Sequence, residues 1–315
     1  MKKLFVSVLA VAALAACANE EIVSMDKGEA IQFGNAFVNN STRAADPSYS
    51  TKDIESLLVY GTVNNQNIFD AAIVSKGDNN YNSTWSCTDA LGNEIKQYWI
   101  AGANYKFVGI VDGVKDGVTT TDVDQNTKMP TTITYNADGK TDLLCATVER
   151  LNNTNYNTVA FTFTHLLSKV NFTVTNESTD ASGYSFVVKN IKLAGNKTGV
   201  YDVVAGAWDT DEFTTGETIL PAITVASGAA SNELTTEVLF LPGEYVITFD
   251  VDIIYNSEVI TTTSYPATTG AYKYDLDAAK SYNFNVDVAV GQKINFTVSA
   301  QPTWTPNTGG DLGLN

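Results

Sequence analysis

Alternation of apolar and polar residues is the feature that most restricts the fold of this chain. In several stretches every second residue is apolar, which places those side chains on one face of an extended strand. The clearest runs are YVITFDVDIIY at 245–255, VAFTFTH at 159–165, KVNFTVTN at 169–176, SYNFNVDVAV at 281–290 and KINFTVSA at 293–300. Residues 57–63 and 98–111 also have strand character, and no segment has the pattern of a long amphipathic helix. The chain is therefore predicted to be an all-β protein.

Composition agrees with strands and bounds the number of domains. Hydrophobic residues make up 44% of the chain, and Thr, Val, Asn, Tyr and Phe are abundant, as in half-buried strands with polar turns. Roughly 270 residues follow Arg43, enough for one large or two ordinary domains. We predict two β-sandwich domains, transthyretin-like or immunoglobulin-like, at residues 44–157 and 158–315. The Asn-rich stretch 149–158 marks their boundary, and a boundary near 176–183 is the competing choice.

Charge excludes one class of partner. The formal net charge is −16 at pH 7, from 19 Lys and Arg against 35 Asp and Glu. A chain so acidic cannot neutralise a phosphate backbone, so we expect no nucleic acid partner. The same balance argues against adhesion to anionic lipid through a basic patch. We interpret the acidity as a means of solubility.

The N-terminal stretch MKKLFVSVLAVAALAAC has the layout of an export signal. Two lysines precede an apolar run that is too short to cross a membrane as a helix. Its last four residues, ending at Cys17, resemble the lipobox of bacterial lipoproteins, in which the signal is removed and the cysteine is acylated. We expect residues 1–16 to be the signal peptide and Cys17 to carry the lipid. An ordinary secretory signal that ends in cysteine is the alternative.

Few side chains are available for catalysis or metal binding. His165 is the only histidine, which excludes His-rich zinc sites, and no Gly-x-Ser-x-Gly elbow is present. We expect His165 to be satisfied at a strand-to-turn junction. Asp122, Asp124 and Asn126 alternate as in a calcium loop, but the glycine and glutamate that such a loop needs are missing. We predict no metal, no cofactor and no enzymatic activity, although paired carboxylates that hydrolyse glycosides would leave no motif.

Two cysteines remain beyond the lipobox, Cys87 and Cys145. An exported pair could form one disulfide, but their separation carries no geometric information. Two buried free thiols are the favoured state.

The stretch FTFTHLLSKVNFTVTN at 161–176, followed by FVVKNIKLAGNKTGVYD at 186–202, resembles the fimbrillins, the lipoprotein pilins of Bacteroidota that build type V pili. The order of N-terminal features is also similar: lipobox, a strand-like segment IQFGNAFV at 31–38, a polar linker, and a strand IESLLVYG at 54–61. Near the other end, KINFTVSAQPTW resembles the C-terminal strand of the family with its closing Trp304.

The resemblance implies a role for Arg43, one of only two arginines in the chain. In fimbrillins a trypsin-like or Arg-specific protease cuts the acylated precursor in this linker, so Ala44 would become the new N-terminus. An exposed polar linker enters a protease cleft without unfolding a domain. The other arginine, Arg150, would have to be protected. Lys52 is the rival site, and an arginine of no consequence is the simplest alternative.

Removal of the first strand would leave the subunit incomplete. Ile31, Phe33 and Phe37 fall on one face of the segment 31–38, and losing three such side chains removes roughly 5–9 kcal/mol. That loss is comparable with the net stability of a domain, about 5–15 kcal/mol. A strand from a neighbouring subunit would replace it by β-strand addition.

The alternating residues Ile294, Phe296 and Val298 make 293–300 a candidate donor strand. The alternative is that this segment is the last strand of its own domain. Residues 305–315, TPNTGGDLGLN, are polar and Gly-rich, unlike the apolar end of stalk pilins, so the sequence does not decide between stalk and tip.

We therefore predict a structural or tip subunit of a cell-surface fimbria, carried to the outer membrane by the lipoprotein export machinery and released into an extracellular fimbrium. Its partners would be other pilin subunits. A permanently lipid-anchored adhesin or glycan-binding lipoprotein is the alternative. Its candidate sugar-stacking residues are the four tryptophans, Trp85, Trp99, Trp208 and Trp304.

Overall fold

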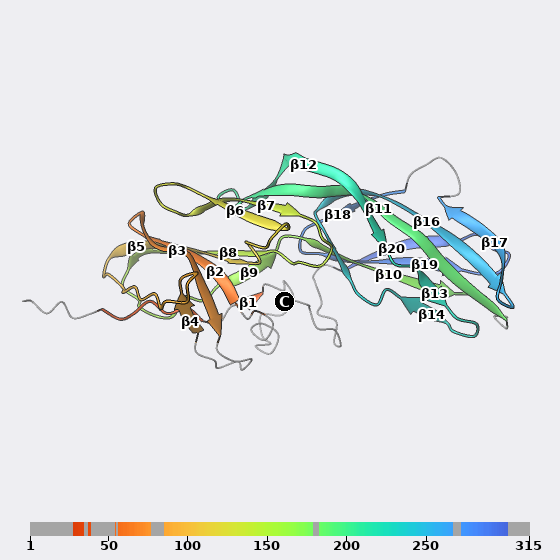
Figure 1. The fold of residues 1–315 in the computed structure, drawn as a ribbon, viewed down its shortest axis with the longest axis horizontal. Coiled ribbons are helices and arrows are strands. Elements are labelled where there is room, and N and C mark those ends of the chain that lie inside the picture. Colours follow the sequence, from red (N-terminus) through yellow and green to blue (C-terminus); the bar gives the residue numbers. More distant parts are fainter. Residues whose placement is uncertain are drawn as a thin grey trace, which may run out of the picture.

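The computed structural model describes residues 28–34, 37–38, 54, 56–76, 85–178, 183–266 and 272–301. In this part of the chain all regular structure is β-strand, so the predicted all-β class is confirmed. No helix among the described residues is long and apolar enough to cross a membrane. The strands form an elongated molecule with the early strands at one end and the late strands at the other (Figure 1).

The early part of the chain forms a seven-stranded sheet, here called the N-terminal sheet. Its strands in spatial order are β1 (Phe37–Val38), β9 (Thr162–His165), β8 (Leu144–Asn153), β5 (Ala103–Val111), β2 (Ser56–Val63), β3 (Gln66–Lys76) and β4 (Trp85–Thr88). All neighbours are antiparallel except β1 and β9, which are parallel. The central strand β5 is buried on both faces, because Phe107 and Val108 point into different cores.

The later part of the chain forms two sheets that pack face to face. The five-stranded sheet contains β14 (Ser231–Glu233), β10 (Ser168–Asn176), β19 (Ser281–Val288), β20 (Asn295–Gln301) and β15 (Val238–Phe240). The eight-stranded sheet contains β17 (Glu258–Tyr265), β16 (Gly243–Tyr255), β11 (Tyr184–Asp202), β7 (Pro130–Asn136), β6 (Thr119–Val123), β12 (Ala207–Leu220), β13 (Ile223–Val225) and β18 (Tyr272–Leu276). Between them lies a core of alternating residues, among them Phe172 and Phe284 from one sheet and Phe186 and Ile247 from the other.

The strand β11 connects the two ends of the molecule. Its first half pairs with β16, from Tyr184 to Ala194, and its second half pairs with β7, from Thr198 to Asp202. The hairpin of β6 and β7 therefore belongs to the eight-stranded sheet although it lies early in the sequence (Figure 1).

A third core lies where the N-terminal sheet meets this extension. It combines Tyr60 and Ile110 from the N-terminal sheet, Tyr135 from β7, Tyr201 from β11 and the connecting Leu167. Backbone pairing and side-chain packing are thus continuous along the molecule.

The chain passes from the N-terminal sheet to the five-stranded sheet between β9 and β10. Residues 159–165 belong with the first sheet, since β9 pairs with β8, and the crossing follows His165 rather than residue 157. The polar segment 149–158, predicted to be the boundary, instead contains the end of β8 and a loop that stays with the N-terminal sheet. Its polarity reflects exposure of that loop to solvent.

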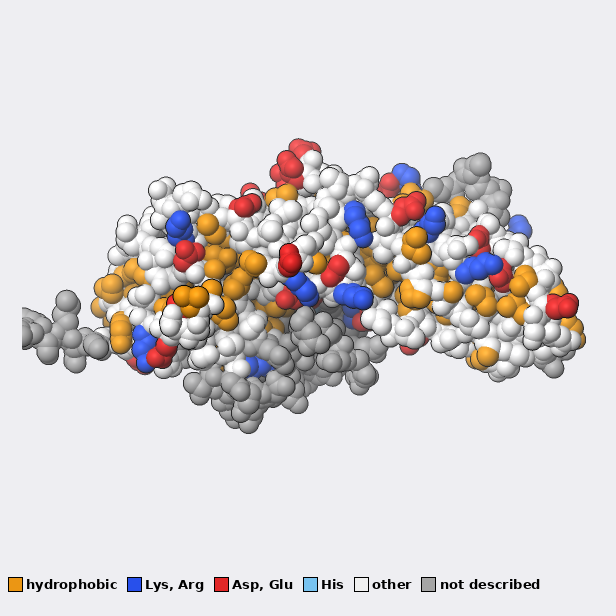
Figure 2. Space-filling model, in the orientation of Figure 1, with side chains coloured by type: hydrophobic (Ala, Val, Ile, Leu, Met, Phe, Trp, Pro, Cys, Tyr) orange, Lys and Arg blue, Asp and Glu red, His pale blue; other side chains and the backbone are white. Residues whose placement is uncertain are grey.

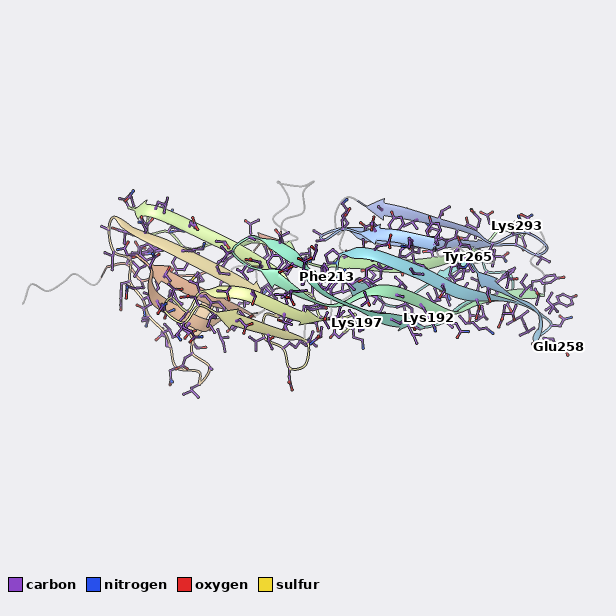
Figure 3. All side chains as sticks on the ribbon, turned by 90° about the horizontal axis from the view of Figure 1, so that it is seen from above. Lys192, Lys197, Phe213, Glu258, Tyr265 and Lys293 are labelled. Carbon is purple, nitrogen blue, oxygen red and sulfur yellow. The ribbon has the colours of Figure 1, made fainter. Side chains whose placement is uncertain are left out.

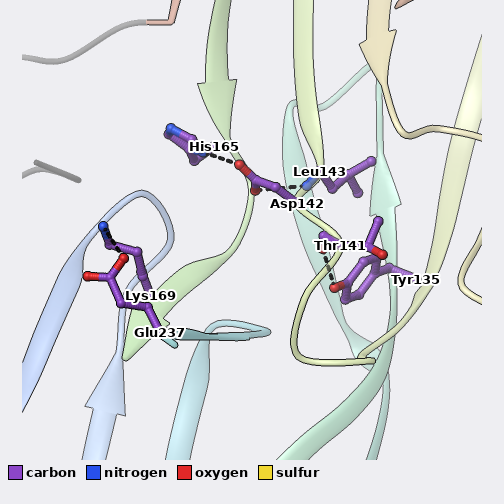
Figure 4. Close-up of polar contacts among 7 residues, drawn as sticks. All are labelled: Tyr135, Thr141, Asp142, Leu143, His165, Lys169 and Glu237. Carbon is purple, nitrogen blue, oxygen red and sulfur yellow. Dashed lines mark hydrogen bonds and ion pairs between the residues drawn. The ribbon is translucent and has the colours of Figure 1, made fainter. Parts of the chain in front are cut away.

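Buried polar contacts hold this crossing in place. His165 lies with its Nδ1 atom 2.6 Å from Asp142 Oδ2, and both side chains are buried, so the histidine is satisfied at a strand end as predicted. The Tyr135 hydroxyl donates to the carbonyl of Thr141, at 2.7 Å (Figure 4). On the next strand, Lys169 Nζ lies 2.9 Å from Glu237 Oε2.

Charged side chains of both signs lie on the face shown in Figure 2, and a group of acidic side chains gathers at its top edge. The structure also has exposed ion pairs, such as Lys106 with Glu149 at 3.0 Å. Pairs of this kind contribute little stability.

Both described cysteines are free thiols, Cys87 on β4 and Cys145 on β8. Burial raises the pKa of Cys87 to about 11 and that of Cys145 to about 12. Burial likewise raises the pKa of the Tyr201 phenol to about 12. These groups are held in their neutral forms by the cores around them.

We predict that the protein loses stability at alkaline pH before these thiols and the Tyr201 phenol ionise in the folded state. The pKa values of these thiols and of Tyr201 are raised on folding, so the unfolded chain loses protons first, from about pH 8.5 upward. Their stabilising contribution is complete below that pH and is lost as the pH rises toward 11–12. Denaturant titrations should give a free energy of unfolding more than about 1 kcal/mol lower at pH 10.5 than at pH 8.

The matched control is Cys145→Ala, which removes the more deeply buried thiol. This variant should lose less stability than the parent over the same interval. If the free energy of unfolding fell equally with pH in the two proteins, the Cys145 thiol would make no contribution to this pH dependence.

Candidate functional site

The candidate site is the place where the residues before β2 enter the N-terminal sheet. Residues 28–34 lie between two walls, and we call the space they fill the strand slot. On one side, Ile31 N–H donates to the Gln97 carbonyl at 2.8 Å and Trp99 N–H donates to the Glu29 carbonyl at 3.0 Å. The segment therefore lies as a strand against residues 97–99.

The opposite wall of the slot is Val159. Its N–H donates to the Gln32 carbonyl at 2.8 Å, and its carbonyl accepts from Gly34 N–H at 3.1 Å. The wall continues as β9, where Phe37 lies opposite Thr162 in a parallel pairing. The segment thus has hydrogen-bond partners on both sides.

Two side chains of the segment point into the core, Ile31 and Phe33, at 8% and 7% exposure, while Gln32 between them is exposed. Phe33 enters a pocket of three phenylalanine rings. Its ring lies edge-on to Phe69 at 5.2 Å and to Phe107 at 5.9 Å, and stacks on Phe161 at 6.1 Å. Such aromatic contacts are stabilising beyond the area they bury. The prediction that Ile31 and Phe33 share a buried face is confirmed for these two residues.

Two glycines leave room for this packing. A Cβ at Gly61 would lie 2.9 Å from ring atoms of both Phe69 and Phe107, so a side chain there would displace the floor of the pocket. At Gly34 a Cβ would lie 3.1 Å from Thr158 Cγ2 and 3.6 Å from Trp85 Cδ1. The strand therefore passes close to the wall directly after Phe33.

Arg150 holds the two walls of the slot together. Its guanidinium donates to the carbonyls of Asn155, Asn157 and Thr158, at 3.3, 2.8 and 3.0 Å. The same group lies 4.9 Å from the centre of the Trp99 ring, as a cation–π contact. Because Val159 follows this loop and Trp99 is in the opposite wall, Arg150 fixes the distance between them.

The environment of Arg150 restricts its side chain. The residue pairs with Tyr105 of β5 within β8, the register shifts directly after it, and its guanidinium is held by the loop carbonyls and by Trp99. Proteases require an extended, accessible segment, and exposed linkers provide one. Burial lowers the pKa of Arg150, but an arginine remains charged.

The predicted processing residues Cys17, Arg43 and Ala44, and the rival Lys52, lie outside the described residues. Trp304 lies outside them as well. Their roles stay predictions.

The candidate donor residues Ile294, Phe296 and Val298 lie at the far end of the molecule from the slot. They belong to β20 or directly precede it, and β20 pairs antiparallel with β19 from Asn295 to Gln301. Phe296 is buried, while Ile294 and Val298 are partly buried against the same core. In this single chain, then, 293–300 ends its own five-stranded sheet.

The three described tryptophans are used for packing. Trp99 is 4% exposed, Trp85 packs against the core of the N-terminal sheet, and the Trp208 indole donates to the Leu166 carbonyl at 2.8 Å. None of them is an exposed platform for a sugar ring.

The suspected calcium loop is a turn. Asp124 accepts hydrogen bonds from the backbone of Asn126 and Thr127, which lowers the pKa of its carboxyl. Within the described ranges no cluster of His, Cys, Asp and Glu suits a metal ion.

The profile of the fimbrillin-like family matches residues 42–302, which is most of the chain. The chain belongs to the fimbrillin-like family. The predicted resemblance is confirmed. Among curated proteins, no relative matches this fimbrillin-like chain.

Solved structures share the fold of this family member. A fimbrial protein from Bacteroides vulgatus aligns with a TM-score of 0.59 and 14% identity, over 88% of this chain and 99% of that chain. A candidate cell adhesion protein from Bacteroides ovatus aligns with a TM-score of 0.50 and 13% identity, over 88% and 98%. At such low identities the similarity establishes the fold.

We call the contacts of Arg150 with the three loop carbonyls and with the Trp99 ring the clamp. The sequence did not predict the clamp, apart from the expectation that Arg150 is protected. The only signals were the scarcity of arginine and a nearby Asn-rich stretch. The partners of the Arg150 guanidinium are backbone carbonyls. Every residue has one, so the side-chain types in the sequence do not reveal these hydrogen bonds.

We predict that Phe33→Ala destabilises the uncut protein by about 3–5 kcal/mol, because it leaves a cavity among Phe69, Phe107 and Phe161. Denaturant unfolding of the full chain measures this change. Gln32→Ala is the matched control, since that side chain is exposed, and should change stability by less than about 0.5 kcal/mol. Equal effects of the two substitutions would show that the pocket contributes nothing specific.

We predict that Arg150→Lys lowers the free energy of unfolding by about 2 kcal/mol, although it keeps the charge. A lysine ammonium lacks the planar fork that reaches several carbonyls and stacks on Trp99. Glu149→Gln, which breaks only an exposed ion pair on the same strand, should change it by less than about 1 kcal/mol. A lysine variant as stable as the parent would contradict the clamp.

Proposed function

We propose that this fimbrillin-like chain is a structural or tip subunit of a cell-surface fimbria, completed by a strand from a neighbouring subunit. The observation that carries the proposal is the way residues 28–34 fill the strand slot. They enter it with hydrogen bonds to both walls and with Ile31 and Phe33 in the core. The family supports a role in fimbriae or adhesion.

Loss of this segment would leave a specific defect. Backbone groups of Gln97, Trp99 and Val159 would lose their partners, and the pocket of Phe33 would be empty. Burial of Ile31 and Phe33 alone contributes roughly 3–6 kcal/mol, a large part of the about 5–15 kcal/mol that stabilises a domain. An incomplete sheet of this kind accepts an incoming strand.

The proposed sequence of events begins with export. The chain is acylated on Cys17 and held at the outer membrane by its lipid. A trypsin-like or Arg-specific protease then cuts after Arg43, which frees residues 17–43 from the rest of the chain. A donor strand from another subunit takes the slot, and the subunit becomes part of an extracellular fimbrium.

The alternative of a permanently anchored glycan-binding lipoprotein gains no support from the site. Its described candidates Trp85, Trp99 and Trp208 are engaged in packing or hydrogen bonding.

N-terminal mapping by mass spectrometry of protein sheared from the cell surface tests the processing step. We expect the mature chain to begin at Ala44, and Arg43→Ala to accumulate as an uncut lipidated monomer. Lys52→Ala is the matched control and should be processed like the parent, because lysine there is not the predicted site. A mature chain that begins at acylated Cys17 in all three proteins would rule out cleavage-dependent assembly.

A further inference from the structure

We propose that the end of the molecule around Tyr98, Ile100 and Leu151 lies against the lipid bilayer that holds the acylated precursor. We call these three exposed side chains the tip patch. The inference rests on the proposed function, because it needs the lipid on Cys17. It adds the surface of the uncut subunit that faces the membrane, and with it the orientation of the subunit before cleavage.

The tip patch is formed by two neighbouring segments. Gly102, in the turn after Ile100, donates its N–H to the Asn153 carbonyl at 2.8 Å, so this turn lies beside the end of β8. Leu151 comes two residues before Asn153, and Tyr98 comes two residues before Ile100. All three side chains of the patch are exposed, Ile100 at 56% and Leu151 at 71%. Exposed apolar side chains that gather in one place mark a surface for interaction.

The part of the chain that leads to the lipid meets the structure beside this patch. Tyr98 forms a β-bridge with Ala30, and Trp99 N–H donates to the Glu29 carbonyl at 3.0 Å. A Cβ at Gly28 would lie only 2.7 Å from the Trp99 carbonyl oxygen, so the backbone at 28 runs close against this wall. The first described residue is therefore a neighbour of the tip patch.

The length of the chain between lipid and patch limits how far apart they can be. From Cys17 to Gly28 there are 28 − 17 = 11 residue steps, which span at most about 40 Å even when fully extended. Figure 1 shows β5 and the segment 28–34, in red, at one end of the elongated molecule and β17 at the other. A tether this short keeps the patch at a high effective concentration near the bilayer, so weak apolar contacts are sufficient.

The side chains of the patch suit the boundary between lipid headgroups and acyl chains. Tyrosine is enriched at membrane–water interfaces, where its ring is apolar and its hydroxyl stays wet. Exposed isoleucine and leucine add apolar area, and attachment to a bilayer surface grows with the apolar area that it buries. The tip patch combines both kinds of side chain.

The charge of this end also permits close approach to lipid. The residues around the patch, 28–34, 94–106 and 149–157, carry three basic and three acidic side chains, a net charge of zero. They are Lys96, Lys106, Arg150, Glu29, Glu94 and Glu149. The whole chain has a net charge of −16, and an acidic surface would be repelled by anionic lipid. This end escapes that repulsion without needing a basic patch.

A second exposed apolar group provides the comparison that the test needs. Val259 and Ile260 are exposed on β17, directly after Glu258, which Figure 3 labels at the far end of the molecule. They resemble the tip patch in chemistry but lie away from residue 28 (Figure 1). The inference therefore predicts that lipid contacts Ile100 and does not contact Ile260.

The experiment compares Ile100→Cys with Ile260→Cys, since these isoleucines have similar exposure, 56% and 53%. Each uncut precursor is purified, labelled with a polarity-sensitive fluorophore, and reconstituted into phosphatidylethanolamine–phosphatidylglycerol vesicles with or without nitroxide-labelled lipid. The native thiols of Cys87 and Cys145 react slowly at pH 7, because burial raises their pKa values to about 11 and about 12. The parent protein, treated in the same way, measures the remaining background.

We expect the label at position 100 to shift to shorter wavelength on reconstitution and to lose about half of its emission to nitroxide lipid, while the label at 260 loses less than about a tenth. Leu151→Asp in the Ile100→Cys background should reduce the quenching about twofold or more, because it places a carboxylate in the patch. Leu151 is exposed, so this variant should fold like the parent. Equal quenching at 100 and 260, or none at 100, would overturn the inference.

The remaining outcomes separate the inference from the proposed function. A wavelength shift at position 100 that grows with protein density, without quenching by nitroxide lipid, would show that a second copy covers the patch and would overturn the inference. Flotation with vesicles by the parent but not by Cys17→Ser confirms the anchor, so missing quenching at 100 then overturns the inference alone. If neither protein floats with vesicles, the anchoring step of the proposed function fails, and the inference fails with it.

Discussion

The pocket that holds Phe33 is the contact on which the N-terminal end of this protein depends. Its floor is made by Phe69, Phe107 and Phe161, from strands and segments far apart in the sequence. Phe33 contacts all three rings, and glycine at position 61 leaves space for Phe69 and Phe107. The core of the N-terminal sheet is therefore completed by a segment that precedes β2 in the chain and is held by hydrogen bonds to Gln97, Trp99 and Val159. A core closed in this way is stable while the segment is present and incomplete without it.

The rest of the molecule provides the frame that holds this segment. The strand β11 pairs with β16 at one end and β7 at the other, and the core around Tyr60, Tyr135 and Tyr201 joins the N-terminal sheet to it. The contacts of Arg150 with the loop at 155–158 and with Trp99 set the width of the slot. These contacts involve no atom of residues 28–34, so removal of that segment would leave them in place. Preorganisation of this kind lowers the cost of binding a new strand.

The sequence predicted the strands that alternate, but it did not predict which strands pair with one another. The runs at 169–176, 245–255 and 281–290 became β10, β16 and β19, because their apolar faces required a shared core. The length of β11 and its pairing with β7 were not predictable, since pairing between hydrogen-bonded backbones leaves no side-chain pattern. For the same reason polarity at 149–158 suggested a boundary where the structure has a strand end and a loop. At the site, the buried face of Ile31 and Phe33 followed from alternation, but the three rings around Phe33 did not.

The two arginines illustrate how structure separates residues of identical chemistry. Arg150 has its guanidinium committed to three carbonyls and the Trp99 ring, and the residue pairs with Tyr105 of β5. A protease that selects arginine would therefore have to break the clamp and the pairing of β8 with β5 before it could cut there. In a chain with no third arginine, such protection would leave Arg43, the proposed processing site, to an arginine-specific protease. The clamp would then serve assembly twice, because it keeps the slot in shape and keeps the protease away from its wall.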